Sequence, residues 1–166
     1  FITQIKALLN ANNNDTMKIM FPMIETIDEY HYLKNWVNEI KKEIGNTNKV
    51  KIGMMLETKK AVETISTFKD VEFLSLGTND LTKELYHINR EFGQNYDVYI
   101  DDLVGVLRDV VKHCNMFNIE LSICGELASV KEVVGKLYDI GIRNFSVSVS
   151  SAKTLEFAIK EKLCIS

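Results

Sequence analysis

Three apolar runs of this sequence end in side chains that could do chemistry. An acid closes the first run, an amide with a second acid closes the next, and a thiol with a third acid closes the last. In chain order these residues are Glu57, Asn79 with Asp80, and Cys124 with Glu126. Packing alone does not explain polar groups at the ends of several buried strands, whereas an active site at the carboxyl ends of parallel strands does.

Glu57 and Asp80 are the sharpest pair among these residues. Mg²⁺ is usually held by one or two carboxylates, while water and substrate oxygens complete its octahedron. Two acids from neighbouring strand ends have the chemistry for that role. The alternative is that each acid only begins a helix, because acids are common and stabilising near helix amino termini.

Three further features carry weaker indications of a site. Cys124 precedes Gly125, and a thiol of pKa about 8.5 can be tuned to protonate a carbanion-like intermediate; an inert buried cysteine is the alternative. The segment 77–80 predicts a glycine turn whose N–H groups bind a phosphate or carboxylate, or an ordinary turn. Arg90, in a polar segment, either reaches an anionic ligand with its planar guanidinium or is solvated.

The spacing of apolar residues predicts strands and helices in alternation. Strands are expected near 17–23, 50–56, 71–76, 120–124 and 144–149, and helices near 1–9, 27–44, 59–68, 103–117, 130–138 and 151–162. Thr26 and Glu29 have the spacing of a capping box at the second helix. Near-continuous apolar strands indicate a parallel α/β sheet buried on both faces. A doubly wound sheet and a (β/α) barrel both fit.

Composition excludes several classes of protein. The 166 residues are 46% hydrophobic and 26% charged with a net charge of −3, which is typical of a globular domain and disfavours a nucleic-acid partner. The apolar runs are too short to span a membrane. Three cysteines without metal-like spacing favour a reducing cytoplasm. Because the first residue is Phe1, we expect a piece of a longer protein or a processed product.

Five segments together resemble one family in order and spacing. They are 19–24 (IMFPMI), 53–58 (GMMLET), 76–82 (LGTNDLT), 124–128 (CGELA) and 145–148 (FSVS). The family is the C-terminal phosphoenolpyruvate-binding barrel domain of Enzyme I of the bacterial phosphoenolpyruvate:sugar phosphotransferase system. Pyruvate phosphate dikinase and phosphoenolpyruvate synthase share these motifs with small changes, but Met-Phe-Pro-Met and Gly-Thr favour Enzyme I.

The resemblance implies a fold, an activity and partners. The fold is a (β/α)8 barrel of the TIM type, incomplete here, with about five βα units over 1–166 that match the family's strands four to eight. The activity is Mg²⁺-dependent phosphoryl transfer from phosphoenolpyruvate to a protein histidine, which releases pyruvate. A histidine-containing phosphocarrier protein would bind through the absent N-terminal domains, and the barrel would form a homodimer in the cytoplasm.

The resemblance also implies a role for each site residue. Glu57 and Asp80 would hold Mg²⁺, while Asn79, Asp80 and Arg90 would bind the substrate. Cys124 would be the catalytic acid that protonates enolpyruvate to pyruvate.

Departures from the family pattern leave other functions open. Lys59 stands where the family has Pro, Lys83 stands where it has Gln, and three barrel strands with the phosphohistidine domain are missing, so the fragment alone is expected to be inactive. A fragment of a dikinase or synthase is one alternative. A non-catalytic dimerisation or regulatory module is another, and a metal-dependent lyase or aldolase is ranked last.

Overall fold

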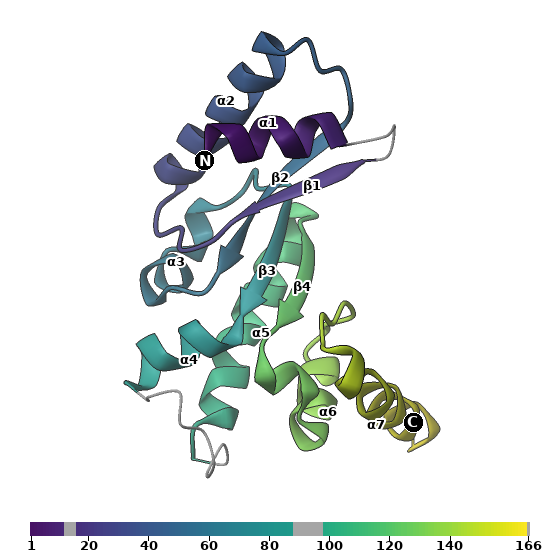
Figure 1. Cartoon of the computed structure of the whole chain (residues 1–166). Helices are drawn as coiled ribbons and strands as arrows, with labels where there is room; N and C mark the ends of the chain where they lie inside the picture. Colours follow the sequence, from purple (N-terminus) through teal and green to yellow (C-terminus); the bar gives the residue numbers. More distant parts are fainter. Residues whose placement is uncertain (12–15, 88–97, 166) are drawn as a thin grey trace.

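The computed structural model describes residues 1–11, 16–87 and 98–165, and its centre is a four-stranded parallel sheet (Figure 1). The strands are β1 (Met17–Phe21), β2 (Val50–Leu56), β3 (Phe73–Gly77) and β4 (Glu120–Cys124). Their spatial order is β1-β2-β3-β4, which is also their chain order. A doubly wound sheet reverses its strand order at a switch point. The observed order therefore favours successive βα units of a barrel, and the chain has an α/β fold.

Helices connect the strands and cover one face of the sheet. They are α1 (Ile2–Ala11), α2 (Ile27–Glu43), α3 (Lys59–Glu63), α4 (Thr78–Tyr86), α5 (Ile100–Phe117), α6 (Lys131–Asp139) and α7 (Ala152–Ile165), with short 3₁₀ helices η1 (Ile65–Thr67), η3 (Glu126–Ser129) and η4 (Val149–Ser151). The two chain ends lie at opposite ends of the molecule (Figure 1). Among the described helices, none is long and apolar enough to cross a membrane.

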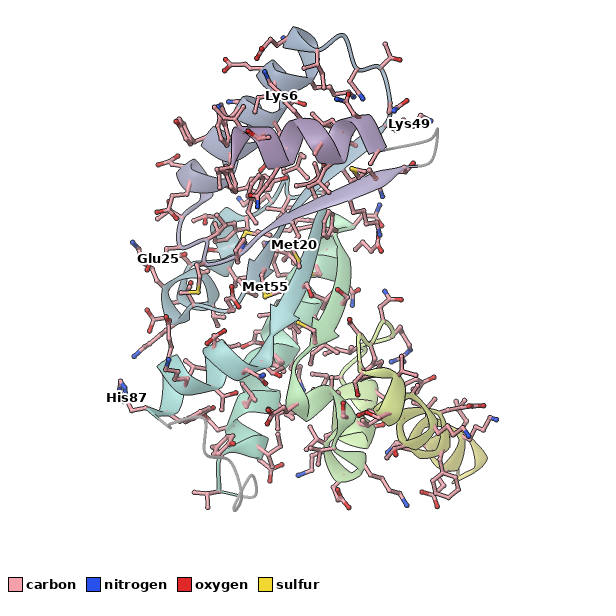
Figure 2. The ribbon with its side chains drawn as sticks, viewed as in Figure 1. Lys6, Met20, Glu25, Lys49, Met55 and His87 are labelled. Carbon is pink, nitrogen blue, oxygen red and sulfur yellow. The ribbon has the colours of Figure 1, made fainter. Side chains whose placement is uncertain are left out.

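The strand register separates two faces of the sheet. On one face alternate side chains join helix residues in a single core: Ile19, Ile52, Leu74 and Ile123. The opposite alternate set forms what we call the inner face: Met20, Met55, Phe73, Ser75 and Ser122. Met20 and Met55 lie over the same part of the sheet (Figure 2). In a closed barrel this face would line the interior.

The expected fifth strand over 144–149 is wrong. Only Phe145 forms a bridge, to Ile123, which is held by Ile123 N–H on Asn144 O (2.9 Å) and Ser146 N–H on Ile123 O (2.8 Å). Beyond this point the Ser148 hydroxyl bonds those of Ser150 and Ser151. Serine hydroxyls compete with ladder pairing by bonding locally, so the chain turns into η4 instead of extending the sheet.

The expected helix over 59–68 is also divided. Helix α3 ends at Glu63 and η1 begins at Ile65. The Thr64 hydroxyl between them donates to Lys60 O at 2.8 Å, and such back-bonding destabilises and bends a helix. Helix α4 (Thr78–Tyr86) lies where no helix was expected, and the other strands and long helices match the expected ones within a few residues.

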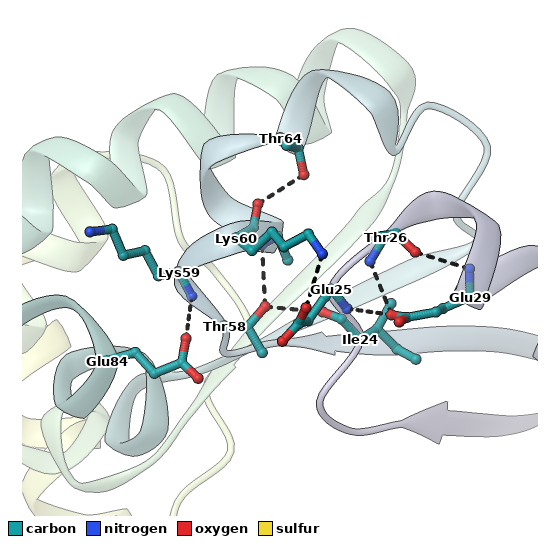
Figure 3. A network of polar contacts seen from close by, with 10 residues as sticks. Ile24, Glu25, Thr26, Glu29, Thr58, Lys59, Lys60, Thr64 and Glu84 are labelled. Atoms are coloured by element: carbon teal, nitrogen blue, oxygen red, sulfur yellow. Dashed lines mark hydrogen bonds and ion pairs between the residues drawn. The ribbon is translucent and has the colours of Figure 1, made fainter.

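The predicted capping box is confirmed at the start of α2 (Figure 3). Glu29 N–H donates to Thr26 Oγ1 (3.2 Å), and Thr26 N–H donates to Glu29 Oε2 (3.1 Å). The Glu25 N–H also donates to Glu29 Oε2, at 2.8 Å. These backbone donors, that of Glu25 above all, lower the pKa of the Glu29 carboxyl. The sequence motif therefore marks the beginning of α2 correctly.

Thr26→Ala is expected to lower the free energy of unfolding by about 1 kcal/mol, because it leaves a helix N–H without its cap. Urea denaturation followed by circular dichroism measures the change. The control is Thr47→Ala, since Thr47 is exposed and lies outside the helices. Equal losses in the two variants would contradict the prediction.

Candidate functional site

The ends of three strands bring Glu57, Gly77 and Cys124 into one row. Gly77 pairs with Cys124, and the last β2–β3 pair is Leu56 with Leu76. Glu57 follows Leu56, so it lies beside Gly77, on the inner face. The acid and the thiol that the sequence singled out thus flank a glycine at the carboxyl edge of the sheet.

Gly77 allows the Glu57 carboxylate to lie over β3. A Cβ on Gly77 would meet Glu57 Oε2 at 2.8 Å and Met55 Sδ at 2.9 Å, closer than packed side chains approach. Its φ is −91°, so left-handed backbone is not the reason for glycine here. The expected glycine turn over 77–80 is wrong: Gly77 ends β3, and α4 begins directly at Thr78.

Glu57 is buried, and a backbone N–H group holds one of its carboxylate oxygens. Only 4% of its surface is exposed. Its Oε1 accepts a hydrogen bond from Met23 N–H at 2.8 Å, and Met23 has a φ of +54°. A carboxylate taken out of water needs such partners, and one oxygen, Oε2, remains directed over Gly77.

Two side chains of the β3–α4 junction bond to the segment after β4. The Thr78 hydroxyl donates to Cys124 O at 2.8 Å, and Glu126 N–H donates to Asn79 Oδ1 at 2.9 Å. We call these contacts the clasp. Gly125 lies inside it with φ +98°, and a Cβ there would collide with Thr78 Oγ1 and come within 2.8 Å of Asn79 Oδ1. The clasp holds the Cys124 backbone in place against α4.

The clasp also orients the Asn79 amide. Because Oδ1 accepts the Glu126 N–H, the amide nitrogen with its two donors points elsewhere. Asp80 follows in the first turn of α4 and is half-buried. A surface pocket of about 400 Å³ opens at this edge. The pocket is lined by residues of the clasp and of the serine-rich segment 146–151, among them Asn79, Gly125, Glu126, Ser146 and Ser148. This pocket therefore borders the Asn79 amide, whereas Glu57, Asp80 and Cys124 are not among the residues that line it.

The Cys124 thiol lies between a donor and an acceptor. Its S–H donates to Leu76 O at 3.4 Å, and the Ser75 hydroxyl donates to Sγ at 3.8 Å. Burial raises the pKa of this thiol, the Ser75 hydrogen bond opposes that rise, and the negative charge of Glu57 adds to it. Cys124 is therefore protonated at neutral pH, as a proton donor must be.

The acids fit a hard divalent cation that a ligand helps to hold. In the part of the chain that the structure describes, no three or more His, Cys, Asp or Glu residues form a metal-binding group. A complete protein cage is not what Mg²⁺ requires, since one or two carboxylates with water and substrate oxygens suffice. Glu57 Oε2, turned over Gly77, and Asp80 on the adjoining α4 supply that donor chemistry.

Two expectations concern residues elsewhere. Arg90 lies outside the described residues, so its predicted role stays a prediction. Lys59, which stands where the resembling family has Pro, donates its backbone N–H to Glu84 Oε2 at 2.6 Å (Figure 3). Pro has no N–H, so this departure adds a link between α3 and α4 and does not disturb the edge.

Ser75 and Thr78 were missed by the sequence analysis. Ser75 lies in β3, two residues before Gly77. Because side chains alternate between the two faces of a strand, Ser75 lies on the same face of the sheet as Gly77. That period was the available signal for Ser75. The contact of Thr78 with Cys124 O joins residues 46 apart in the chain, and no local pattern predicts it.

Comparisons with known proteins identify the family of the chain. Residues 1–163 match the family model described as "PEP-utilising enzyme, PEP-binding domain". The phosphoenolpyruvate-protein phosphotransferase of Mycoplasma genitalium is 32% identical over 155 residues, which cover 91% of this chain and 27% of that protein. The Streptococcus equinus protein of the same name is 30% identical over 160 residues, 91% of this chain and 28% of that protein. The chain thus spans about a quarter of the length of these relatives.

Solved structures show the same fold at lower identity. A citrate lyase from Burkholderia xenovorans superposes with a TM-score of 0.74 and 15% identity, over 95% of this chain and 53% of that chain. An HpcH/HpaI aldolase/citrate lyase family protein from Burkholderia cenocepacia superposes with a TM-score of 0.63 and 15% identity, over 99% of this chain and 70% of that chain. At such identity the likeness concerns fold alone, and it supports the TIM-barrel type with an incomplete barrel.

The family match runs from the first helix into the last and includes every strand end that bears a candidate residue. This match shows that the chain belongs to the PEP-utilising enzymes and corresponds to their PEP-binding domain.

Proposed function

We propose that this chain is part of a phosphoenolpyruvate-protein phosphotransferase of the Enzyme I type and supplies part of its phosphoenolpyruvate (PEP) site. The observation that carries the proposal is the row of Glu57, Gly77 and Cys124 beside Asn79 and Asp80, at one edge of the sheet. Barrel enzymes place their active sites at this edge.

Each side chain has a role in this proposal. The Asn79 amide nitrogen donates to a phosphoryl oxygen, since the clasp holds its carbonyl oxygen. Glu57 and Asp80 hold Mg²⁺, which offsets negative charge on the phosphate and the enolate. The Cys124 thiol protonates the methylene carbon of enolpyruvate, so the S–H bond breaks, a C–H bond forms and pyruvate leaves. Arg90 is proposed as a further phosphoryl ligand.

The wider activity belongs to the longer protein. The curated relatives are named phosphoenolpyruvate-protein phosphotransferase, and this chain matches about a quarter of them. We propose that the phosphorylated histidine, the binding of a phosphocarrier protein and the missing barrel strands lie in an N-terminal part. Cytoplasmic location, a homodimer and inactivity of the fragment alone complete the proposal.

Other functions are less well supported. The named relatives favour a phosphotransferase over a dikinase or synthase. A non-catalytic module gives no reason for a buried Glu57 and a bonded Cys124 in one row. The aldolase and lyase structures share only the fold.

A thermal melt with Mg²⁺ and oxalate, an enolpyruvate mimic, tests the proposed site. We expect the melting temperature to rise only when both are present, because each completes the other's binding site. Ligand at a hundredfold excess over Kd stabilises the native state by about 2.7 kcal/mol. Asp80→Ala should abolish the rise. Asp28→Ala, which removes an exposed acid from the first turn of α2, should keep it.

The outcomes separate two conclusions. A rise that needs both ligands and is lost in Asp80→Ala supports the proposed site. A cooperative melt that no ligand combination shifts would show that this edge does not bind the pair in the chain as tested, and would favour the non-catalytic module.

A further inference from the structure

Ser75 is a buried polar residue whose hydroxyl contacts the Cys124 thiol. It is central in β3, 6% exposed, and pairs with Ser122 of β4. Its hydroxyl donates to Cys124 Sγ across the strands at 3.8 Å. The hydroxyl of Ser122 lies on the same face but donates to Leu74 O at 3.4 Å. Two serines in one register row therefore have different partners, sulfur for one and backbone for the other.

The contacts of the Cys124 sulfur differ in which protonation state they favour. The Leu76 carbonyl accepts the S–H at 3.4 Å, and an acceptor of this kind stabilises the thiol. The Ser75 hydroxyl donates to the sulfur and stabilises the thiolate. When the proton leaves, the Leu76 contact is lost and the Ser75 contact gains strength, because a hydrogen bond to a charged group is the stronger one.

We propose that Ser75 is the positioning residue of the Cys124 proton donor, and that its hydroxyl holds the sulfur in place and stabilises the thiolate left after proton transfer. The inference rests on the proposed function for its role in turnover. In that step the Cys124 S–H bond breaks, the proton joins the methylene carbon of enolpyruvate, and the thiolate later takes a proton from water. Ser75 itself neither gains nor loses a proton.

Alkylation of Cys124 by iodoacetamide tests this inference without reference to turnover. The rate is measured on the full chain over about pH 7 to 10 by mass spectrometry of the peptide that contains Cys124. In Ser75→Ala we expect the midpoint of the rate profile to move to higher pH, with alkylation at pH 8 slower by about fivefold, the factor of one net hydrogen bond. Ser75→Thr, which keeps a hydroxyl, should restore the wild-type midpoint.

Ser122→Ala is the matched control, because it removes a hydroxyl that lies in the same row but donates to Leu74 O instead of to the sulfur. Buried Cys114 provides an internal reference for global opening. An unchanged midpoint in Ser75→Ala, or an equal shift in Ser122→Ala, would overturn the inference. If Ser75→Ala does not fold, the Ser75→Thr variant decides. A wild-type alkylation midpoint in Ser75→Thr supports the inference, and a displaced midpoint, despite the retained hydroxyl, would overturn it. Failure of the Mg²⁺–oxalate melt with a positive Ser75 result would reject the proposed function alone.

Discussion

Gly125→Ala is expected to lower the free energy of unfolding by about 3 kcal/mol, the largest loss among the substitutions considered. Gly125 has φ +98° and ψ 176°, a region that is essentially restricted to glycine and costs other residues about 1–3 kcal/mol. A Cβ would also collide with Thr78 Oγ1 and crowd Asn79 Oδ1, and overpacking adds about 1–3 kcal/mol. Because both atoms belong to the clasp, relief of the collision breaks its hydrogen bonds.

Urea denaturation measures this loss, and Gly105→Ala is the matched control. Gly105 lies within α5, and nothing is within 4 Å of a Cβ built there. Alanine is favoured over glycine in a helix by about 1 kcal/mol, so the control should gain stability. A Gly125→Ala variant as stable as the wild type would show that the clasp does not constrain the chain after β4.

Glu57→Gln is expected to change two properties of the site in opposite directions. The amide keeps an oxygen to accept the Met23 N–H, so the fold should persist. Loss of the negative charge should weaken Mg²⁺–oxalate binding by more than tenfold, since even outer partners of metal ligands contribute 10- to roughly 100-fold. The same change should accelerate alkylation of Cys124 at pH 8 in the absence of metal.

The direction of the second effect follows from the pKa of the thiol. Burial is the main cause that raises the pKa of Cys124, and the charge of Glu57 raises it further. Without that charge the pKa falls, and more thiolate is present at pH 8. The raised pKa stabilises the native state fully below the thiol pKa of the unfolded chain. This contribution to the free energy of unfolding is lost as the pH rises through the pKa of Cys124 in the native state. In Glu57→Gln that pKa is lower, so the loss should be complete at a lower pH.

Glu126→Gln is the control for Glu57→Gln. Glu126 is an exposed acid at the same edge, and solvent screens its charge. Its substitution should leave both the melt with ligands and the alkylation profile close to those of the wild type. Slower alkylation in Glu57→Gln would contradict the electrostatic argument, while retained ligand binding would remove Glu57 from the metal site.

Local chemistry could be predicted wherever neighbours in the chain cause it. The capping box at Thr26 depends on residues three apart, and the alternation of strands and helices depends on apolar periodicity within single elements. The prediction of a fifth strand was wrong for a local reason that the apolar pattern does not reveal. Phe145 and Val147 suit a strand, but the serines at 148, 150 and 151 bond one another and turn the chain.

The sequence by itself determined which residues are candidates for the proposed chemistry. Glu57, Asn79, Asp80 and Cys124 are recognisable by type and by their place at the ends of apolar runs, because strand burial leaves a periodic record in the chain. Only the tertiary structure decided how they lie relative to one another. Gly77 is required by the approach of Glu57 to β3, and Gly125 is required by the clasp. These constraints, like the contact of Ser75 with the sulfur, act between strands, where distance along the chain carries no information about distance in space.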